Sequence, residues 1–166
     1  MQVLIAVDPG PTESAWCLLR EGNPVAWGKE PTPLVRDRLR GWRVPVYIEM
    51  IASYGMAVGR EVFDTCTWIG RMEQVVEDCG CQAHRIFRID VKTHLCKRPN
   101  ANDSNIRQAL IDRFGPGKDK AIGTKKRPGP LYGMAGDCWA ALAVAVTAYD
   151  QALTGMPASM PRALYD

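Results

Sequence analysis

The sequence predicts an α/β protein with a mixed β-sheet and helices packed on its faces. Three apolar segments typical of strands come first, within residues 1–30, and helices alternate with strands after them. Consecutive strands joined by tight turns favour antiparallel pairing, whereas strands separated by helices favour parallel pairing. We expect one domain over residues 1–155, followed by an irregular tail at residues 156–166, because no internal repeat divides the chain.

The first predicted strand covers residues 2–8, because five apolar residues in a row precede Pro9-Gly10. The next two strands are predicted at residues 14–20 and 24–29, on either side of the turn sequence Glu-Gly-Asn. A short basic helix follows, and then a fourth strand that is again almost wholly apolar, as internal strands are. These two elements are predicted at residues 34–41 and 46–50.

In the second half, apolar residues recur at three- and four-residue steps over residues 59–78, which is typical of an amphipathic helix. A strand is predicted at residues 83–89, and Asp103-Ser104 can cap a helix that ends at Gly115. From Gly115 to Gly136 the sequence has six glycines and no periodicity, which predicts a long exposed loop. An alanine-rich helix is predicted at residues 137–153.

Basic residues are concentrated in one part of the chain. Residues 85–127 carry twelve Lys/Arg against four Asp/Glu, a local excess of +8, although the net charge of the whole chain is only +3. An anionic partner would bind such a segment, whereas a solvated, lysine-rich loop explains the same composition without a partner.

Three carboxylates stand at positions where an acid is hard to explain by stability. Asp8 ends one apolar strand, Glu49 lies in another, and Asp137 opens an apolar helix. A carboxylate beside a buried strand needs a positive partner, so the three together favour a shared cation of the kind that oxygen ligands hold, Mg²⁺ or Mn²⁺. Each also has a structural alternative: Asp8 can cap a turn, Glu49 can pair with a lysine, and Asp137 can be an ordinary acid at a helix N-terminus.

The same three segments resemble motifs of the RuvC-type Holliday-junction resolvases of the RNase H-like superfamily. Val-Asp-Pro-Gly-Pro-Thr around Asp8 resembles their first motif, and Tyr-Ile-Glu-Met around Glu49 resembles their second. Asp-Cys-Trp-Ala-Ala-Leu-Ala from Asp137 resembles their last motif. The order of the predicted elements is also that of the superfamily, and the short length resembles some phage-encoded members. The resemblance implies an RNase H-like mixed sheet.

The resemblance further implies a structure-selective DNA endonuclease that resolves four-way junctions by two-metal phosphodiester hydrolysis. Asp8, Glu49 and Asp137 would be the ligands of two Mg²⁺ or Mn²⁺ ions, with Asp8 between them and water as the nucleophile. In the family a basic residue assists near the scissile phosphate. The local candidates for this role are Lys92, Lys97 and Arg98, of which Lys92 is assigned as the catalytic residue.

The last motif departs from the family at one position. The usual pattern is Asp-x-x-Asp, and the place of the second acid is taken by Ala140. Either three carboxylates suffice or another acid contributes, for which Asp103 and Asp64 are candidates. Asp103 more readily caps a helix, and Asp64 more readily lies on a solvated helix face.

DNA contact would account for the basic segment, because lysine and arginine neutralise phosphates. The residues expected to do so are Lys97, Arg98, Lys118, Lys120, Lys125, Lys126 and Arg127. The resemblance also implies a homodimer, since two active sites would cut a four-way junction symmetrically. The helix at residues 59–78 is a candidate interface element, although its apolar stripe is equally explained by contact with the sheet.

Other functions stay open at this point. Ala140 also suits an RNase H-like module that binds structured DNA without cutting, and a nuclease for flaps or RNA–DNA hybrids would carry the same motifs. An actin- or sugar-kinase-like ATP-binding protein also has Asp-x-Gly after its first strand, but the glycine-rich phosphate loops that it needs are missing. Cys79, Cys81 and His84 lack the usual zinc-site spacing, so free thiols are expected. The absence of an export signal and of a membrane-length apolar run predicts a cytoplasmic protein.

Overall fold

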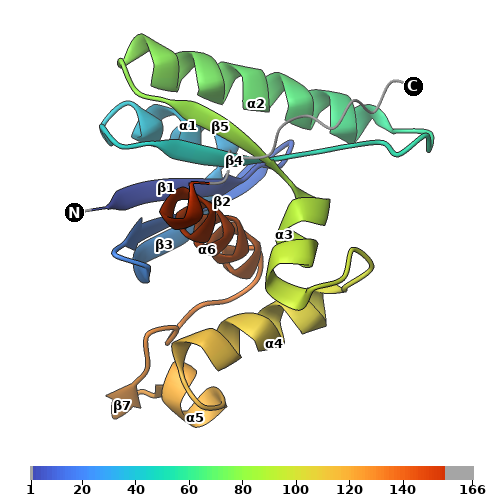
Figure 1. Ribbon diagram of the computed structural model, residues 1–166. Coiled ribbons are helices and arrows are strands. Elements are labelled where there is room, and N and C mark those ends of the chain that lie inside the picture. Colours follow the sequence, from blue (N-terminus) through green and yellow to red (C-terminus); the bar gives the residue numbers. More distant parts are fainter. Residues whose placement is uncertain (1, 156–166) are drawn as a thin grey trace.

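A computed structural model describes residues 2–155 of the chain (Figure 1). The sheet consists of β1 Val3–Asp8, β2 Glu13–Arg20, β3 Asn23–Pro31, β4 Val46–Met50 and β5 Ala83–Phe87. Its strand order is β3-β2-β1-β4-β5. The first three strands pair antiparallel, whereas β4 pairs parallel with both β1 and β5. The predicted mixed sheet, an antiparallel meander followed by parallel strands, is confirmed.

Helices cover both faces of this sheet (Figure 1). They are α1 Thr32–Leu39, α2 Arg60–Asp78, α3 Arg88–Cys96, α4 Asp103–Phe114, α5 Lys118–Ala121 and α6 Cys138–Thr154. The alternation of side chains along β1 divides the core in two. Leu4 and Ala6 pack in the cluster that contains the apolar residues of α6, whereas Ile5 and Val7 pack with those of α1 and α2. α6 is buried on all sides over residues 141–148, which explains why this segment has almost no polar residue.

The apolar stripe of α2 mainly covers the sheet. Ile69, Met72 and Val76 are almost fully buried in the cluster shared with β1 and β4. Phe63 on the same helix is 63% exposed, so one large apolar side chain remains at the surface.

The second half differs from the sequence-based prediction at two places. β5 ends at Phe87 rather than at residue 89, because α3, which was not predicted, begins at Arg88. Only Val91 of α3 is fully buried, so the helix has little amphipathic pattern. The cap of α4 is Asn102 rather than Asp103-Ser104. The Asn102 side chain accepts a hydrogen bond from the backbone N–H of Asn105 (2.9 Å), and the Asn105 side chain accepts one from the backbone N–H of Asn102 (3.1 Å).

The segment between α4 and α6 is not the continuous exposed loop that the sequence predicts. It contains α5 and a small hairpin of β6 Gly123–Thr124 and β7 Arg127–Pro128. Ala121 and Leu131 are fully buried in the cluster beside α6 and anchor the segment to the core. Gly123 has a φ of +70°, and a Cβ there would lie 2.2 Å from the Arg127 carbonyl oxygen, so the hairpin requires glycine.

The tail predicted at residues 156–166 lies outside the described residues. In the part of the chain that the structure describes, no helix combines the length and apolar character needed to cross a membrane.

Candidate active site

Asp8 and Glu49 lie at the carboxyl ends of two neighbouring parallel strands. The register pairs Val7 of β1 with Ile48 of β4, so the next position along each strand places Asp8 beside Glu49. Side chains at paired positions of parallel strands point to the same face of the sheet. For Asp8 this is the α6 face, because Ala6, two residues earlier, packs in the α6 cluster. Both carboxylates therefore belong to the face that α6 covers.

Asp137 comes to the same end of the sheet because it immediately precedes α6. Asp8 and Asp137 line one hollow of about 170 Å³. The other walls come from α3, α4 and α6 and include Arg88, Asp103, Arg107, Trp139 and Ala140. Glu49 is only 9% exposed and is joined to the hollow through Arg88.

The carboxyl group of Asp8 is in an unfavourable position for a negative charge. Burial, and then the charges of Glu49 and Asp137, raise its pKa from 3.8 to about 7. Burial also raises the pKa of Glu49, although the positive charge of Arg88 opposes this. Within residues 2–155, no hydrogen bond or ion pair to Asp8 is found. A cation beside Asp8 would offset both the free-energy cost of burying its charge and the repulsion from Glu49 and Asp137.

Lys29 holds the third carboxylate. Its Nζ lies 2.7 Å from Asp137 Oδ2 and 3.6 Å from Glu13 Oε2. The strand registers align Asp8 with Ala15 and Ala15 with Lys29, so Lys29 stands on the same face of the sheet as Asp8. The hydrogen bond to Asp137 raises the pKa of Lys29, which therefore stays charged at neutral pH.

Arg88 is a site residue that the sequence analysis missed. It is the first residue of α3, and it emerges beside Glu49 because β5 pairs with β4 up to Met50 and Phe87. Its Nη1 donates to Glu49 Oε1 (3.1 Å), and its Nη2 donates to Asp103 Oδ1. In the sequence Arg88 falls inside the strand predicted at residues 83–89, and only the strand register brings it to the carboxylates.

Lys92, the basic residue proposed from the sequence, lies one turn after Arg88 in α3. It lines a second hollow of about 260 Å³, whose other walls are Tyr54, Arg88, Ile89 and Pro99. Its charge lowers the pKa of Glu49, but less than that of Arg88 does. The structure thus places Lys92 next to the carboxylate hollow and not among its lining residues.

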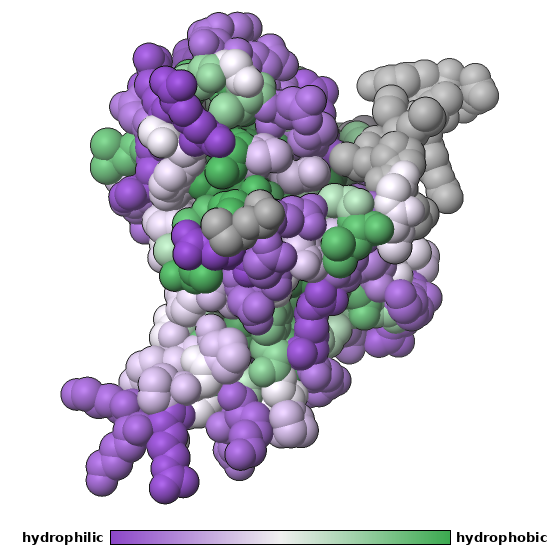
Figure 2. Space-filling model, turned by 60° about the vertical axis from the view of Figure 1, so that its left-hand side comes forward, coloured by the Kyte–Doolittle hydropathy of each residue, from purple (hydrophilic) through white to green (hydrophobic). Residues whose placement is uncertain are grey.

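The basic residues expected to contact DNA lie in two groups. At the end of α3, the Lys97 ammonium donates to the carbonyl oxygen of His94 (2.9 Å), and Arg98 donates to Asn105 Oδ1 (2.9 Å). The second group is exposed on α5 and on the β6–β7 hairpin: Lys118, Lys120, Lys125, Lys126 and Arg127. Figure 2 shows long hydrophilic side chains projecting at the bottom of the molecule, at the level of β7 in Figure 1.

The residues present suit a divalent cation in their chemistry, but their side chains are not already arranged around a cation position. Carboxylate oxygens are the donors that Mg²⁺ and Mn²⁺ prefer, and among residues 2–155 no side chain forms an ion pair with Asp8. Within the described range, no three His, Cys, Asp or Glu side chains form a group that could already hold a metal ion. Arg88 and Lys29 instead hold two of the three carboxylates.

The two candidates for a fourth acid differ in position. Asp103 lines the hollow and accepts a hydrogen bond from Arg88, whereas Asp64 pairs with Arg60 on α2 at 3.5 Å and is not among the residues that line it. Ala140 lines the hollow at the position one turn after Asp137, so α6 offers a methyl group there.

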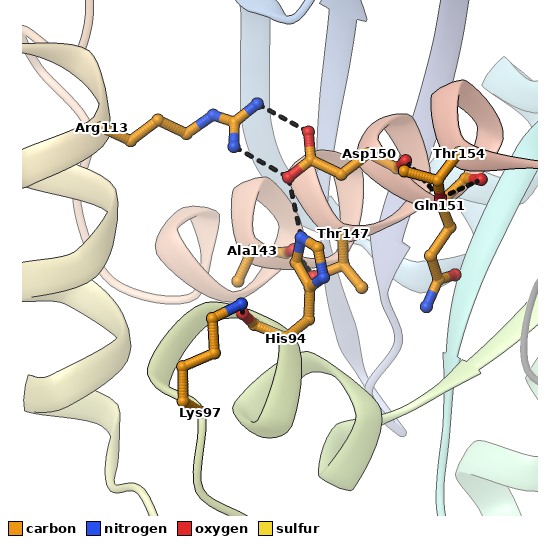
Figure 3. A network of polar contacts seen from close by, with 8 residues as sticks. All are labelled: His94, Lys97, Arg113, Ala143, Thr147, Asp150, Gln151 and Thr154. Carbon is orange, nitrogen blue, oxygen red and sulfur yellow. Dashed lines mark hydrogen bonds and ion pairs between the residues drawn. The ribbon is translucent and has the colours of Figure 1, made fainter. Parts of the chain in front are cut away.

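A polar network fixes α3 and α4 to α6 (Figure 3). Arg113 of α4 donates two hydrogen bonds to Asp150 of α6 (2.8 and 2.7 Å), and His94 Nε2 of α3 lies 2.7 Å from Asp150 Oδ2. Burial alone would raise the pKa of Asp150, but the hydrogen bonds from Arg113 and His94 lower it overall. The network therefore sets the position of α3 and α4, which carry Arg88 and Asp103.

Comparison with known proteins finds a similarity of fold to solved RuvC structures. No protein-family model and no curated protein matches the sequence. Among solved structures, RuvC from Thermus thermophilus is 16% identical, with a TM-score of 0.67 over 93% of this chain and 98% of that one. T. thermophilus RuvC in complex with a Holliday junction substrate has a TM-score of 0.69 at the same identity, over 94% and 98% of the two chains. The mixed sheet and its helices are those of the RuvC-type, RNase H-like fold.

Proposed function

We propose that this protein is a divalent-metal-dependent endonuclease that cuts branched DNA, with the four-way junction as its substrate. One observation supports the proposal most: Asp8 lies at the same end of the sheet as Glu49 and Asp137, whose negative charges help to raise its pKa. The substrate class is supported by the similarity to T. thermophilus RuvC, which has been solved with a Holliday junction substrate.

In this proposal a divalent ion would neutralise charge on the scissile phosphate and activate water for in-line attack. Asp8 would be the central ligand, with Glu49 and Asp137 beside it. Water adds to phosphorus, the bond to one bridging ester oxygen breaks, and the leaving oxygen takes up a proton. The products are a phosphate monoester and a hydroxyl. Lys29 would keep the Asp137 carboxylate ionised and oriented through their 2.7 Å contact.

The exposed lysines and arginines would contact phosphates on either side of the carboxylates. Lys92 would contact the DNA strand next to the cut. Lys92 lines the second hollow, and Arg88 lines both this hollow and the one that contains Asp8 and Asp137. The lysines of α5 and of the hairpin would bind a more distant part of the same duplex. Such contacts provide affinity without reading bases, and their strength falls steeply with salt.

We further propose a cytoplasmic homodimer, because one chain offers one set of carboxylates and a four-way junction has two symmetric cleavage positions. Exposed Phe63 on α2 is compatible with a contact between copies. Sedimentation velocity of wild type and Phe63→Ala would test the dimer.

The proposed activity is tested with a labelled four-way junction, a flap, an RNA–DNA hybrid and a linear duplex, each with Mg²⁺, Mn²⁺ or EDTA. We expect paired cuts in the junction that require metal, and none by Asp8→Asn, which should still bind it. Asp112→Asn, which changes an exposed acid of α4, should cut like wild type. Preferred cleavage of the flap or the hybrid would overturn the substrate assignment.

A second candidate function is a module that binds branched DNA without cutting it. Ala140 favours it, because α6 carries one acid fewer at the hollow than the motif that it resembles. Tight junction binding with no cleavage under either metal would establish this candidate and overturn the first.

A further inference from the structure

The hollow beside Asp8 already contains a fixed positive charge. Arg88 lines it together with Asp8, Asp137 and Ala140. Its guanidinium is held between Glu49 of β4 and Asp103 of α4, so two separate elements set its position. A cation fixed by two carboxylates is preorganised, and preorganised charge is the kind that stabilises a transition state without a cost of reorganisation.

The guanidinium also keeps unused hydrogen-bonding capacity. An arginine has five N–H donors, and the contacts with Glu49 and Asp103 use one on Nη1 and one on Nη2. The side chain is 36% exposed and lines the hollow. Planar guanidinium groups bind phosphate oxygens with two parallel hydrogen bonds.

The position of Arg88 between the two hollows indicates which phosphate it would meet. One hollow contains Asp8 and Asp137, and the other contains Lys92 and the ring of Tyr54; Arg88 lines both. A DNA strand that extended from the carboxylates to Lys92 would therefore pass Arg88.

We propose that Arg88 is a catalytic residue whose guanidinium contacts the scissile phosphate in the place of a second divalent ion, so that each chain works with one ion. This inference rests on the proposed endonuclease function. It adds to that function the residue that supplies positive charge at the phosphate besides the metal ion. Hydrolysis by in-line displacement needs positive charge on both the attacking and the leaving side of phosphorus. Asp8 and Asp137 would hold the ion on one side, and Arg88 supplies the other charge. Ala140 leaves α6 without the carboxylate that a second ion would need.

The first experiment measures metal binding without DNA, by isothermal titration with Mn²⁺. Wild type should bind one ion per chain. Arg88→Ala should bind Mn²⁺ more tightly, by roughly tenfold, the order expected in water when a unit charge close to a divalent ion is removed. Arg36→Ala, which breaks a guanidinium–carboxylate pair on α1, should bind like wild type. Two ions per wild-type chain, or unchanged affinity in Arg88→Ala, would overturn the proposal.

The second experiment measures single-turnover cleavage of the junction. Arg88→Ala should cut about 10²–10³-fold more slowly at saturating metal, the loss typical of one preorganised donor to a transition-state oxygen, while junction binding changes less than threefold. Added guanidinium ion should restore part of the rate to Arg88→Ala and none to Asp8→Asn. Arg88→Lys keeps the charge, is expected to fold, and should still cut at least tenfold more slowly, because ammonium cannot reproduce the planar fork.

A rate for Arg88→Ala within threefold of wild type, or the absence of guanidinium rescue, would overturn the catalytic role. If wild-type protein cuts none of the substrates, the proposed function fails. The Mn²⁺ titration then still decides separately whether the hollow binds one ion or two.

Discussion

Replacing Asp8 by asparagine should stabilise the metal-free protein at pH 8 by about 2–4 kcal/mol. The pKa of Asp8 is about 7 in the folded protein against a reference value of 3.8. At about 1.4 kcal/mol per pKa unit, ionising this buried carboxyl costs the folded state up to about 4 kcal/mol, and relaxation of the site reduces that value. Asparagine has nearly the same shape and no charge, so the variant avoids this cost.

The sign of the pH dependence follows from the raised pKa. Between pH 3.8 and about pH 7 the unfolded chain has lost the Asp8 proton while the folded protein keeps it, so stability of wild type falls as pH rises through this window. The advantage of Asp8→Asn should therefore be near zero below pH 4, about 1–2 kcal/mol at pH 5, and largest above pH 7.

Urea unfolding in EDTA at pH 5 and pH 8 measures this difference directly. Mg²⁺ should stabilise wild type at pH 8 and leave Asp8→Asn unchanged, because a ligand that binds only the folded state shifts the equilibrium toward it. Asp112→Asn, which changes an exposed acid, should stay within about 0.5 kcal/mol of wild type at both pH values. A variant that is equally or less stable than wild type at pH 8 would refute the conclusion that Asp8 is held in an unfavourable charged state.

Three further changes test the surrounding structure. Joint replacement of the hairpin cations by glutamine should reduce the slope of log K against log[salt] for junction binding by about 3, as measured by fluorescence anisotropy, and an unchanged slope would exclude the hairpin from the DNA contact. The replaced residues are Lys125, Lys126 and Arg127. Asp150→Asn should lower the free energy of unfolding by about 1–3 kcal/mol, because it weakens the hydrogen bonds from Arg113 and His94; urea unfolding at pH 7 that matches wild type would contradict a stabilising role. Lys29→Met should slow junction cleavage at least about tenfold with little change in binding, since Asp137 loses its 2.7 Å partner, and a wild-type rate would show that this ion pair does not position the carboxylate.

The sheet could be predicted from the sequence because its strands are short apolar runs ended by turn residues. β1 is stopped by Pro9-Gly10, and β2 and β3 are separated by a turn of two residues. α3 could not be predicted in this way, because Val91 is its one fully buried residue and no periodic pattern results. The packing of the segment around Leu131 could not be predicted for a related reason. Single residues anchor this segment to the core, and the sequence around them is rich in glycine, so no periodic pattern marks them.

The acidic half of the candidate site was predictable, and the basic half was not. Asp8 and Glu49 attract attention in the sequence because each stands in an apolar strand. Nothing in the sequence next to Arg88 or Lys29 marks either residue as part of a site, and their importance depends on which strands are neighbours. Arg88 reaches an acid 39 positions away along the chain, and Lys29 reaches Asp137 from the edge strand of the sheet. Contacts of this kind follow from register, which a single sequence does not specify.

These two cations explain how the carboxylates coexist when no metal neutralises them. Arg88 is paired with Glu49 and Lys29 is paired with Asp137, whereas within residues 2–155 Asp8 has no ion pair, and its raised pKa lets a proton remove its charge. The same pairs oppose metal binding, because an incoming ion is repelled by Arg88 and Lys29 and competes with them for oxygen atoms. A DNA phosphate that accepts hydrogen bonds from Arg88 weakens its attraction to Glu49 and partly neutralises its charge. DNA and the metal ion should therefore favour each other's binding by the same factor, since coupling between two ligands is reciprocal. A site of this construction would bind its metal ion more tightly when a phosphate is in place than when it is absent.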